Sequence, residues 1–471
     1  MKSRTQLILF ALTAMLLFAS TIQQQTGLFK FKKLGGVTYS SPKPEATWRN
    51  FIDGDLQAKS EAYLQQNFGF HEPLTRLYNQ TQWTFFRYSK VAEDQRILIT
   101  SDNWIFEPWT VEEYYQSRAY RYAQDSTEMA SFLETEAQLL YKVQKIIEPY
   151  GTHLFVALLP GKELICAEHM PENTQYFKEK KITAFDFYSK RLDEIGINNI
   201  NLGKWFMQMK DTVSYPLYPQ TGTHWSNLAA IHSFDTILRY MEWLSDSNML
   251  NIKAGGIYKR TLMPDNDLES LMNLIWPLNK APNYLAAAYY DIDTTAWHPH
   301  LLTIGDSYYW NILNHTPIWD VFDSIPYWYY FSTAYFNGPE SSVGRIDILK
   351  EVLSADFVML ANSTVAQYDL NKGFAQRFLT EWCYDDEEIA EVKTEMKERI
   401  RKNESWMEGI VKKAENQGLP VDSVLNMETS YFMKNRPEEC FPALKDSIPN
   451  KQSNRAKQII NQLKSTNHGI Q

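Results

Sequence analysis

The fold is decided by the stretch Leu301-Leu302-Thr303-Ile304-Gly305-Asp306-Ser307, an apolar run that stops abruptly at Gly-Asp-Ser. Such a run predicts a buried strand, and the small residues after it predict a turn that lifts the Ser307 hydroxyl to the carboxyl edge of a sheet. In open α/β sheets, that edge is where sites are built. A serine hydroxyl is a weak nucleophile unless a base takes its proton, and histidine is the usual base. Ser307 is therefore a candidate nucleophile that needs a histidine from elsewhere in the chain.

A second stretch, Gln220-Thr221-Gly222-Thr223-His224-Trp225-Ser226-Asn227, supplies a histidine. His224 precedes Ser307 in the chain, but triads are recognised by geometry and roles, so this order excludes nothing. Each residue also has a structural explanation, because a serine after a strand can cap the next helix and a lone histidine is usually structural. Only the pair favours catalysis. His224 would then be the base with Trp225 packed behind it, and the N–H of Ser307 would help to hold an oxyanion.

Strand and helix patterns alternate along the middle of the chain. Leu154–Leu159 is too apolar and too short for anything but a buried strand. Further strands are predicted at 197–202, 301–304, 321–330 (against which Pro326 argues) and 357–361, a hairpin at 101–103, and helices at 56–68, 131–150, 180–195 and 345–353. This alternation predicts one doubly wound α/β domain with a mostly parallel sheet.

Composition divides the chain into four parts. Residues 1–23 read as a signal peptide or membrane anchor, residues 24–45 as a polar linker, and residues 46–384 as the α/β domain. Residues 385–471 carry dense mixed charge, with helical runs at 388–402 and 406–417. We expect this last part to be an appended helical segment and not a catalytic unit.

The N-terminus has the pattern of an export signal. Lys2 and Arg4 precede Leu7–Ala19, an almost unbroken apolar run. The run is short for a full membrane span, Ala19-Ser20 is a weak cleavage site, and no cysteine near its end would allow lipoprotein anchoring. The sequence predicts a periplasmic or other extracytoplasmic location, reached with either a cleaved signal peptide or an uncleaved anchor.

Overall composition narrows the classes of partner. The 471 residues carry a net charge of −9 with no offsetting basic patch, which argues against nucleic acid. The 14% aromatic content suits a surface that stacks on sugar rings, although core packing explains any single ring at least as well. We expect no disulfide framework, no metal and no nucleotide cofactor, since there is no phosphate-binding glycine loop and no recognisable metal spacing among Cys166, Cys383, Cys440, His298 and His300.

The Gly-Asp-Ser turn and the His-Trp pair together resemble the SGNH hydrolase superfamily. The histidine-first order resembles its permuted branch, the alginate O-acetyltransferase-like periplasmic proteins. Gly-Asp-Ser alone would be weak evidence, because three common residues recur by chance. Three further stretches agree with the branch, namely Asn67–Leu74, Ile99–Phe106 and Leu159–Glu163. The resemblance covers about residues 45 to 370 and implies an SGNH-like fold with a circularly permuted motif order.

One departure from the family pattern concerns the acid of the triad. The family has an aspartate two residues before the histidine, and other SGNH proteins have it three before, but these positions hold Gly222 and Thr221. Asp306 adjoins the nucleophile, yet the aspartate of Gly-Asp-Ser is not the triad acid in the superfamily. We interpret Gly222 as the mark of a weakened or re-sited triad, either a Ser-His dyad or one whose carboxylate arrives from elsewhere.

The resemblance also indicates oxyanion and substrate contacts. In the superfamily an asparagine after a buried strand helps to form the oxyanion hole, and Asn362 follows the predicted strand 357–361. An asparagine in a turn explains the residue equally well. Lys162, Trp225 and Tyr308 are candidate substrate contacts, although Lys162 could equally be a solvated side chain at a strand end.

The resemblance implies O-acetylation of an exported polysaccharide. Ser307 would be acetylated and a sugar hydroxyl would then attack the ester. Proteins of this branch typically receive acetyl groups from a membrane-bound O-acyltransferase, so we expect that partner and, if the anchor is uncleaved, the membrane. Two other classes stay open. One is a secreted carbohydrate esterase, in which water attacks the same acyl-enzyme. The other is a non-catalytic glycan-binding or scaffold protein, which Gly222 favours.

Overall fold

The computed structural model describes residues 2–36, 41–116, 118–121, 123–171, 180–261, 265–336 and 338–467. Its centre is a seven-stranded sheet with the order β12-β11-β10-β9-β13-β3-β4. The strands from β10 to β4 are parallel, and β11 and β12 are antiparallel additions at one end. The bounds are β3 His153–Leu159, β4 Asn199–Asn201, β9 Leu301–Gly305, β10 Tyr327–Tyr329, β11 Thr333–Tyr335, β12 Ser341–Ser342 and β13 Phe357–Ser363.

The five strands predicted from the sequence are the five parallel strands, so the predicted α/β fold class is confirmed. The fourth is much shorter than the predicted 321–330. Residues 318–321 form the helix α14, and β10 begins only after Pro326, which has no N–H to donate to a neighbouring strand.

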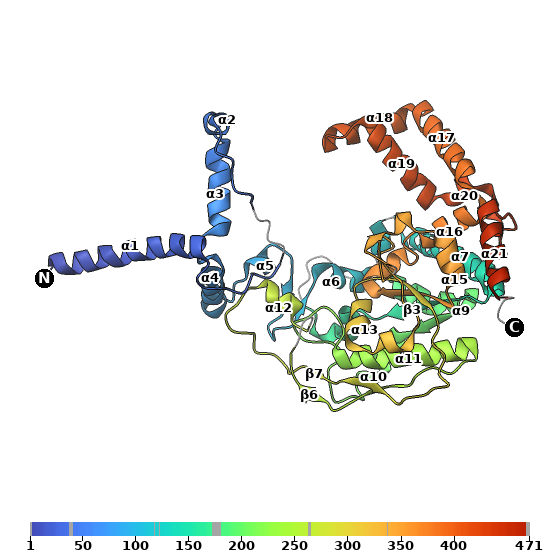
Figure 1. Cartoon of the computed structure of the whole chain (residues 1–471), viewed down its shortest axis with the longest axis horizontal. Helices are drawn as coiled ribbons and strands as arrows, with labels where there is room; N and C mark the ends of the chain where they lie inside the picture. Colours follow the sequence, from blue (N-terminus) through green and yellow to red (C-terminus); the bar gives the residue numbers. More distant parts are fainter. Residues whose placement is uncertain are drawn as a thin grey trace.

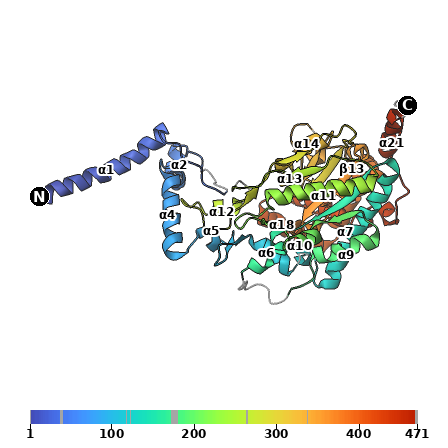
Figure 2. The same cartoon turned by 90° about the horizontal axis from the view of Figure 1, so that it is seen from below.

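Helices cover both faces of the sheet (Figures 1 and 2). Along β13, Val358 and Leu360 pack into the core of one face, whereas Met359 and Ala361 pack into the core of the other. This alternation is expected for a strand buried on both sides. The helices of the sheet domain are α6 Pro108–Tyr115, α7 Ser126–Ile147, α8 Lys162–Ile165, α9 Ala184–Ile195, α10 Leu202–Met209, α11 Asn227–Ser245, α13 Tyr309–His315, α14 Ile318–Val321, α15 Ile348–Ser354 and α16 Phe374–Cys383.

Between α11 and β9 the chain leaves these layers and forms short elements that were not predicted. Strand β5 (Ile252–Ala254) pairs with β8 (Ala288–Tyr290), and β6 (Tyr258–Lys259) pairs with β7 (Tyr284–Leu285). The short helix α12 (Asp267–Leu271) lies within this excursion. The predicted hairpin at 101–103 is present as β1 (Leu98–Ile99) and β2 (Ile105–Phe106).

The N-terminal helices lie outside the layers (Figures 1 and 2). They are α1 Lys2–Thr26, α2 Trp48–Ile52, α3 Asp55–Asn67, α4 His71–Phe86 and α5 Lys90–Glu93. Within α1, the 23 residues Arg4–Thr26 are long and apolar enough to cross a membrane, although a signal sequence meets the same criteria. The helix continues beyond the apolar run, through the polar residues after Ala19, and the choice between a cleaved signal peptide and an uncleaved anchor stays a prediction.

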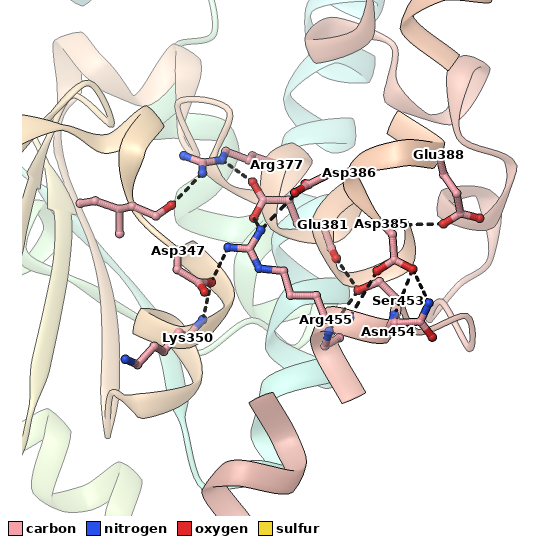
Figure 3. A network of polar contacts seen from close by, with 12 residues as sticks. Asp347, Lys350, Arg377, Glu381, Asp385, Asp386, Glu388, Ser453, Asn454 and Arg455 are labelled. Carbon is pink, nitrogen blue, oxygen red and sulfur yellow. Dashed lines mark hydrogen bonds and ion pairs between the residues drawn. The ribbon is translucent and has the colours of Figure 1, made fainter. Parts of the chain in front are cut away.

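The C-terminal part is helical, as predicted. It contains α17 Asp386–Lys402, α18 Glu404–Gln417, α19 Val421–Asn435, α20 Pro437–Cys440 and α21 Asn454–Asn467. Helices α17 to α19 form an arm with a small core of its own (Figure 1), and α21 returns to the sheet domain. Ion pairs and hydrogen bonds hold α21 against the sheet domain. The guanidinium of Arg455 lies 3.0 Å from Asp347 and 3.9 Å from Glu381, and Asn454 donates to Asp385 at 2.8 Å (Figure 3).

Candidate active site

The structure brings the predicted nucleophile and base together. Ser307 lies in the turn between β9 and α13, and His224 lies in the loop before α11. The Nε2 atom of His224 is 2.9 Å from the Oγ atom of Ser307. Ser226 caps α11 by accepting the N–H of Ala229 at 3.3 Å, so the helix begins directly after the His-Trp pair. In this arrangement a histidine can remove the proton of a serine.

Asp267, which the sequence analysis missed, lies on the other side of the imidazole. Its Oδ2 atom is 3.4 Å from Nδ1 of His224. Its Oδ1 atom accepts the N–H groups of Thr223 at 2.9 Å and Leu268 at 2.8 Å, which fixes the carboxylate. The 3.4 Å separation is within ion-pair range but too long for a well-formed hydrogen bond, and no described residue offers Nδ1 a hydrogen bond. Asp267 lies at the place in space that a triad acid occupies, although the sequence position at which the family carries this acid holds Gly222.

Helix α12 is fastened to the loop that carries His224. The N–H of Glu269 donates to the carbonyl of Thr221 at 3.2 Å, and the Thr221 hydroxyl donates back to Glu269 at 2.9 Å. Lys280 forms an ion pair with the same carboxylate. These contacts hold α12 against the loop and bring Asp267 to the histidine. No short sequence motif carries this information, because the contact joins two distant segments.

Thr223 is held through three of its polar groups. Its N–H donates to Asp267, its carbonyl accepts the Tyr308 hydroxyl at 3.1 Å, and its own hydroxyl donates to Glu107 at 2.9 Å. Burial raises the pKa of Glu107 to about 7, and the hydrogen bond from Thr223 opposes that shift. Together these contacts fix the backbone immediately before His224 and thereby the direction of its ring.

Lys162 is not a substrate contact, so that expectation was wrong. The residue is 2% exposed. Its Nζ atom donates to the carbonyls of Ile105 at 2.7 Å, Gln220 at 2.9 Å and Gly222 at 2.8 Å. Three carbonyls match the three hydrogens of an ammonium group, whereas burial lowers the pKa of Lys162 to about 7. The side chain fastens the β1–β2 hairpin to the loop that carries His224.

Trp225 and Tyr308 are also buried, at 0% and 3% exposure, and the expectation that they contact substrate is corrected in the same way. The Trp225 ring stacks on Phe206 with 5.9 Å between centroids, so it packs behind the loop as expected. The Tyr308 ring lies 5.0 Å from the His224 ring. Both aromatic residues support the histidine from beneath the surface.

Asn362 is fully buried near the end of β13. Its Nδ2 atom donates to the carbonyl of Leu370 at 2.8 Å, and its backbone carbonyl accepts from the side-chain amide of Gln367 at 3.0 Å. One amide hydrogen is thus used within the fold, and no hydrogen bond between Asn362 and Ser307 occurs among the described residues. Its oxyanion role stays a prediction.

Tyr330, which the sequence analysis did not single out, contacts the nucleophile. Its phenol lies close enough to the side chain and backbone of Ser307 for these groups to lower the pKa of the phenol, against the larger effect of burial. Burial raises the pKa of the Tyr330 phenol above its usual value, so the hydroxyl keeps its proton. The residue has a φ of 49°, and its N–H donates to the carbonyl of Gly305 at 2.8 Å. Left-handed backbone in a residue other than glycine is strained and recurs at functional sites.

The site reaches the molecular surface. The side chains of His224 and Asp267 are 17% and 23% exposed, and Ser307 is partly exposed. A serine, a base and a carboxylate in this order can perform nucleophilic acyl transfer. Within the part of the chain that the structure describes, no group of three or more His, Cys, Asp or Glu side chains is arranged to hold a metal ion.

Comparisons with known proteins agree with the motifs. Residues 97–296 match the family described as SGNH hydrolase-like domain, acetyltransferase AlgX. The matched segment contains His224 and Asp267 and ends before Ser307. No curated protein sequence matches the chain.

Solved structures with similarity to the chain share little sequence with it. The O-acetyltransferase domain of Pseudomonas putida AlgJ is 16% identical, with 58% of this chain and 92% of that chain covered and a TM-score of 0.38. Pseudomonas aeruginosa AlgX is 12% identical, with 58% and 66% covered and a TM-score of 0.36. Bacillus cereus PatB1 is 12% identical, with 57% and 96% covered and a TM-score of 0.35.

The family match confirms the predicted resemblance and the predicted SGNH-like fold class, and it supports the prediction of an SGNH-type enzyme of the O-acetyltransferase class. Residues 97–296 of this chain are therefore similar to the SGNH hydrolase-like domain of the AlgX acetyltransferase family.

Proposed function

We propose that the protein is an extracytoplasmic O-acetyltransferase that modifies an exported polysaccharide through an acetyl-Ser307 intermediate. The observation that carries the proposal is the continuous alignment of Ser307, His224 and Asp267, joined by contacts of 2.9 Å and 3.4 Å. The family match supports the acetyltransferase class.

In the first half-reaction the Ser307 hydroxyl attacks the carbonyl carbon of an acetyl ester. His224 Nε2 takes the serine proton as the new C–O bond forms, and the carbonyl oxygen becomes an oxyanion. The resulting imidazolium faces Asp267, whose negative charge stabilises it. His224 then gives the proton to the leaving alcohol, the old ester bond breaks, and acetyl-Ser307 remains.

In the second half-reaction a sugar hydroxyl attacks the carbonyl carbon of acetyl-Ser307. His224 takes the proton of that hydroxyl and returns it to the Ser307 oxygen as the serine ester breaks. The N–H of Ser307 donates to the oxyanion in both steps. A membrane-bound O-acyltransferase is the proposed source of acetyl groups.

The proposal is tested by supplying an activated acetyl ester together with polysaccharide fragments that carry free hydroxyl groups. A transferase moves acetyl to the fragments, whereas an esterase releases acetate at the same rate with or without them. Ser307→Ala abolishes both reactions if Ser307 is the nucleophile. Ser332→Ala is a matched control, because Ser332 is exposed in the neighbouring turn and its hydroxyl donates only to the Tyr329 carbonyl at 3.0 Å.

The binding-protein alternative rested on the glycine at position 222. That argument is weaker because the carboxylate of Asp267 lies beside Nδ1 of His224. Equal inertness of wild type and Ser307→Ala toward activated acetyl esters would restore that alternative.

A further inference from the structure

Helix α4 is amphipathic, but its apolar side faces outward. Leu74, Leu77, Tyr78 and Phe85 are 51%, 53%, 58% and 75% exposed. Residues three, four, seven or eleven positions apart lie on the same face of a helix. These four side chains therefore form one continuous stripe, which we call the outer stripe of α4.

The opposite side of α4 contacts the rest of the protein through polar side chains and through Trp83, which is 8% exposed and packs in a small apolar cluster. Arg76 donates to the carbonyl of Lys33 at 2.8 Å, and Asn79 donates to the carbonyl of Met272 at 2.9 Å. Gln80 accepts the N–H groups of residues 275 and 276 at 3.1 and 3.0 Å. The helix is therefore held in place by hydrogen bonds and by the buried Trp83, all on the side away from the outer stripe.

A helix on a protein surrounded by water normally buries its apolar stripe. Helix α4 instead buries Trp83 and exposes the four apolar side chains of the outer stripe. An exposed apolar stripe of this kind marks a surface that is covered in the working state. The polar residue within the stripe, Thr81, donates its hydroxyl to the carbonyl of Leu77 at 2.8 Å. The outer stripe can therefore enter an apolar layer without leaving that hydroxyl unpaired.

The end of α1 is built into a junction with α4. Gln23 is 7% exposed, and its amide both donates to and accepts from the backbone of Phe29, at 2.7 and 2.9 Å. Gly69, at the bend before α4, lies so close to α1 that a methyl group there would overlap the Ser20 carbonyl oxygen and the Gln24 nitrogen. Residues 20–24 thus form part of the folded structure, which favours an uncleaved N-terminal segment.

The junction sets α1 crosswise to the helices that follow it. Figure 1 shows α3, and Figure 2 shows α4, running across the inner end of α1 and not along it. The 23 residues Arg4–Thr26 span about 35 Å at ~1.5 Å per residue, enough for a hydrocarbon layer of about 30 Å. If α1 crosses a membrane, α3 and α4 lie along the surface of that membrane.

The segment between α1 and α4 carries positive charge. Lys30, Lys32 and Lys33 are exposed directly after α1. Basic residues at this depth attract anionic lipid headgroups, with about 1 kcal/mol for each charge near the surface. Trp48 in α2 is 77% exposed, and tryptophan is enriched at membrane interfaces.

We propose that α4 is an interfacial helix whose outer stripe lies in the headgroup layer of the membrane that α1 crosses. The junction at Gly69 and Gln23 fixes α4 against α1, so one insertion event places both helices. The sheet domain, which is fastened to α4 through Arg76, Asn79 and Gln80, is thereby held close to the bilayer. This proposal stands independently of the acetyl-transfer chemistry.

The test uses full-length protein in vesicles of phosphatidylethanolamine and phosphatidylglycerol. Leu77→Cys and Phe85→Cys are each labelled with an environment-sensitive fluorophore, in a Cys440→Ser background because Cys166 and Cys383 are buried. Lys412→Cys, exposed on α18, is the matched control. We expect a blue shift and quenching by nitroxide-bearing lipid at positions 77 and 85, and neither at 412.

Equal quenching of all three labels by aqueous iodide would overturn the proposal. Labels at 77 and 85 that are exposed in vesicles but protected in native membranes would also overturn it, in favour of a protein partner. A second measurement uses a fluorophore at Leu74→Cys. In the Leu77→Glu/Phe85→Glu background we expect this label to lose its blue shift and its quenching by nitroxide-bearing lipid. Thermal unfolding should stay unchanged there, because both side chains are more than half exposed. Leu419→Glu, on the C-terminal arm, should leave the label at 74 in lipid.

Discussion

The Nδ1 atom of His224 lies 3.4 Å from the Oδ2 atom of Asp267, which belongs to α12 and not to the loop that holds the histidine. A triad acid fixes the tautomer of the imidazole and stabilises the imidazolium that forms. Asp267 is placed to stabilise the imidazolium, and it would also fix the tautomer if the 3.4 Å separation shortened to a hydrogen bond. Its Oδ1 atom is anchored to the backbone of Thr223. The chain therefore keeps a carboxylate at the histidine although Gly222 replaces the local one.

Asp267→Asn should reduce kcat for acetyl-enzyme formation by up to about four orders of magnitude, by analogy with loss of the acid in a serine protease. The amide oxygen can still accept the Thr223 N–H, so the loop should keep its shape. Kinetics with an activated acetyl ester measure the effect. Asp291→Asn is the control, since Asp291 forms an exposed ion pair with Lys253. A kcat unchanged by Asp267→Asn would show that the site works as a Ser-His dyad.

Lys162→Met should lower both the free energy of unfolding and the activity. The carbonyls of Ile105 and Gly222 lose their donor, whereas that of Gln220 still accepts the Ile105 N–H. Each unpaired buried group costs about 1–3 kcal/mol, so we expect the free energy of unfolding to fall by about 2 kcal/mol or more. Urea unfolding and ester kinetics measure the two effects. Lys210→Met is the matched control, because Lys210 also donates to a backbone carbonyl but is partly exposed. Wild-type stability in Lys162→Met would contradict the assigned role.

Stability should depend on pH through Glu163. Burial raises its pKa from 4.5 to about 7. Between about pH 4.5 and about pH 7 the folded state therefore keeps a proton that the unfolded state has released. The contribution of Glu163 to the free energy of unfolding is full below about pH 4.5 and is lost as the pH rises through about 7. Urea unfolding at about pH 5 and about pH 8 should show a smaller decline in Glu163→Gln than in wild type. Identical declines would exclude Glu163 as the source, and Glu61→Gln on the exposed face of α3 serves as control.

Export is tested by a fusion of alkaline phosphatase after residue 30. The phosphatase folds only outside the cytoplasm, so an exported chain gives an active fusion. A fusion that is made in normal amounts but stays inactive in cells would place the sheet domain in the cytoplasm. An active fusion does not distinguish an uncleaved anchor from a cleaved signal peptide. The intact mass of the wild-type protein extracted from membranes does, because cleavage before Ser20 would remove residues 1–19 from the mass.

The parallel core of the fold could be predicted because its strands are fully buried and therefore continuously apolar. Leu154–Leu159 and Leu301–Ile304 show this clearly. Helix α4 could not be predicted in the same way. Most of its apolar residues face outward, whereas Trp83 and several polar residues face the protein, so the pattern does not indicate what the helix packs against.

The site was predictable only where a local pattern carries the chemistry. Ser307 follows a strand and His224 precedes a helix, and the structure brings the two together. Asp267 was missed because its position depends on backbone contacts between α12 and residues 221–223, which leave no periodic trace. Lys162 was misjudged because burial of a lysine beneath a loop cannot be read from its position at a strand end.

The central claim is that Ser307 becomes acetylated with help from His224 and Asp267. The most direct measurement is mass spectrometry of the protein after brief exposure to an activated acetyl ester. We predict an acetyl group on the peptide that contains Ser307 in wild type, a much slower appearance of that adduct in Asp267→Asn, and none in Ser307→Ala. An adduct that forms elsewhere in wild type while Ser307 stays unmodified would contradict the account.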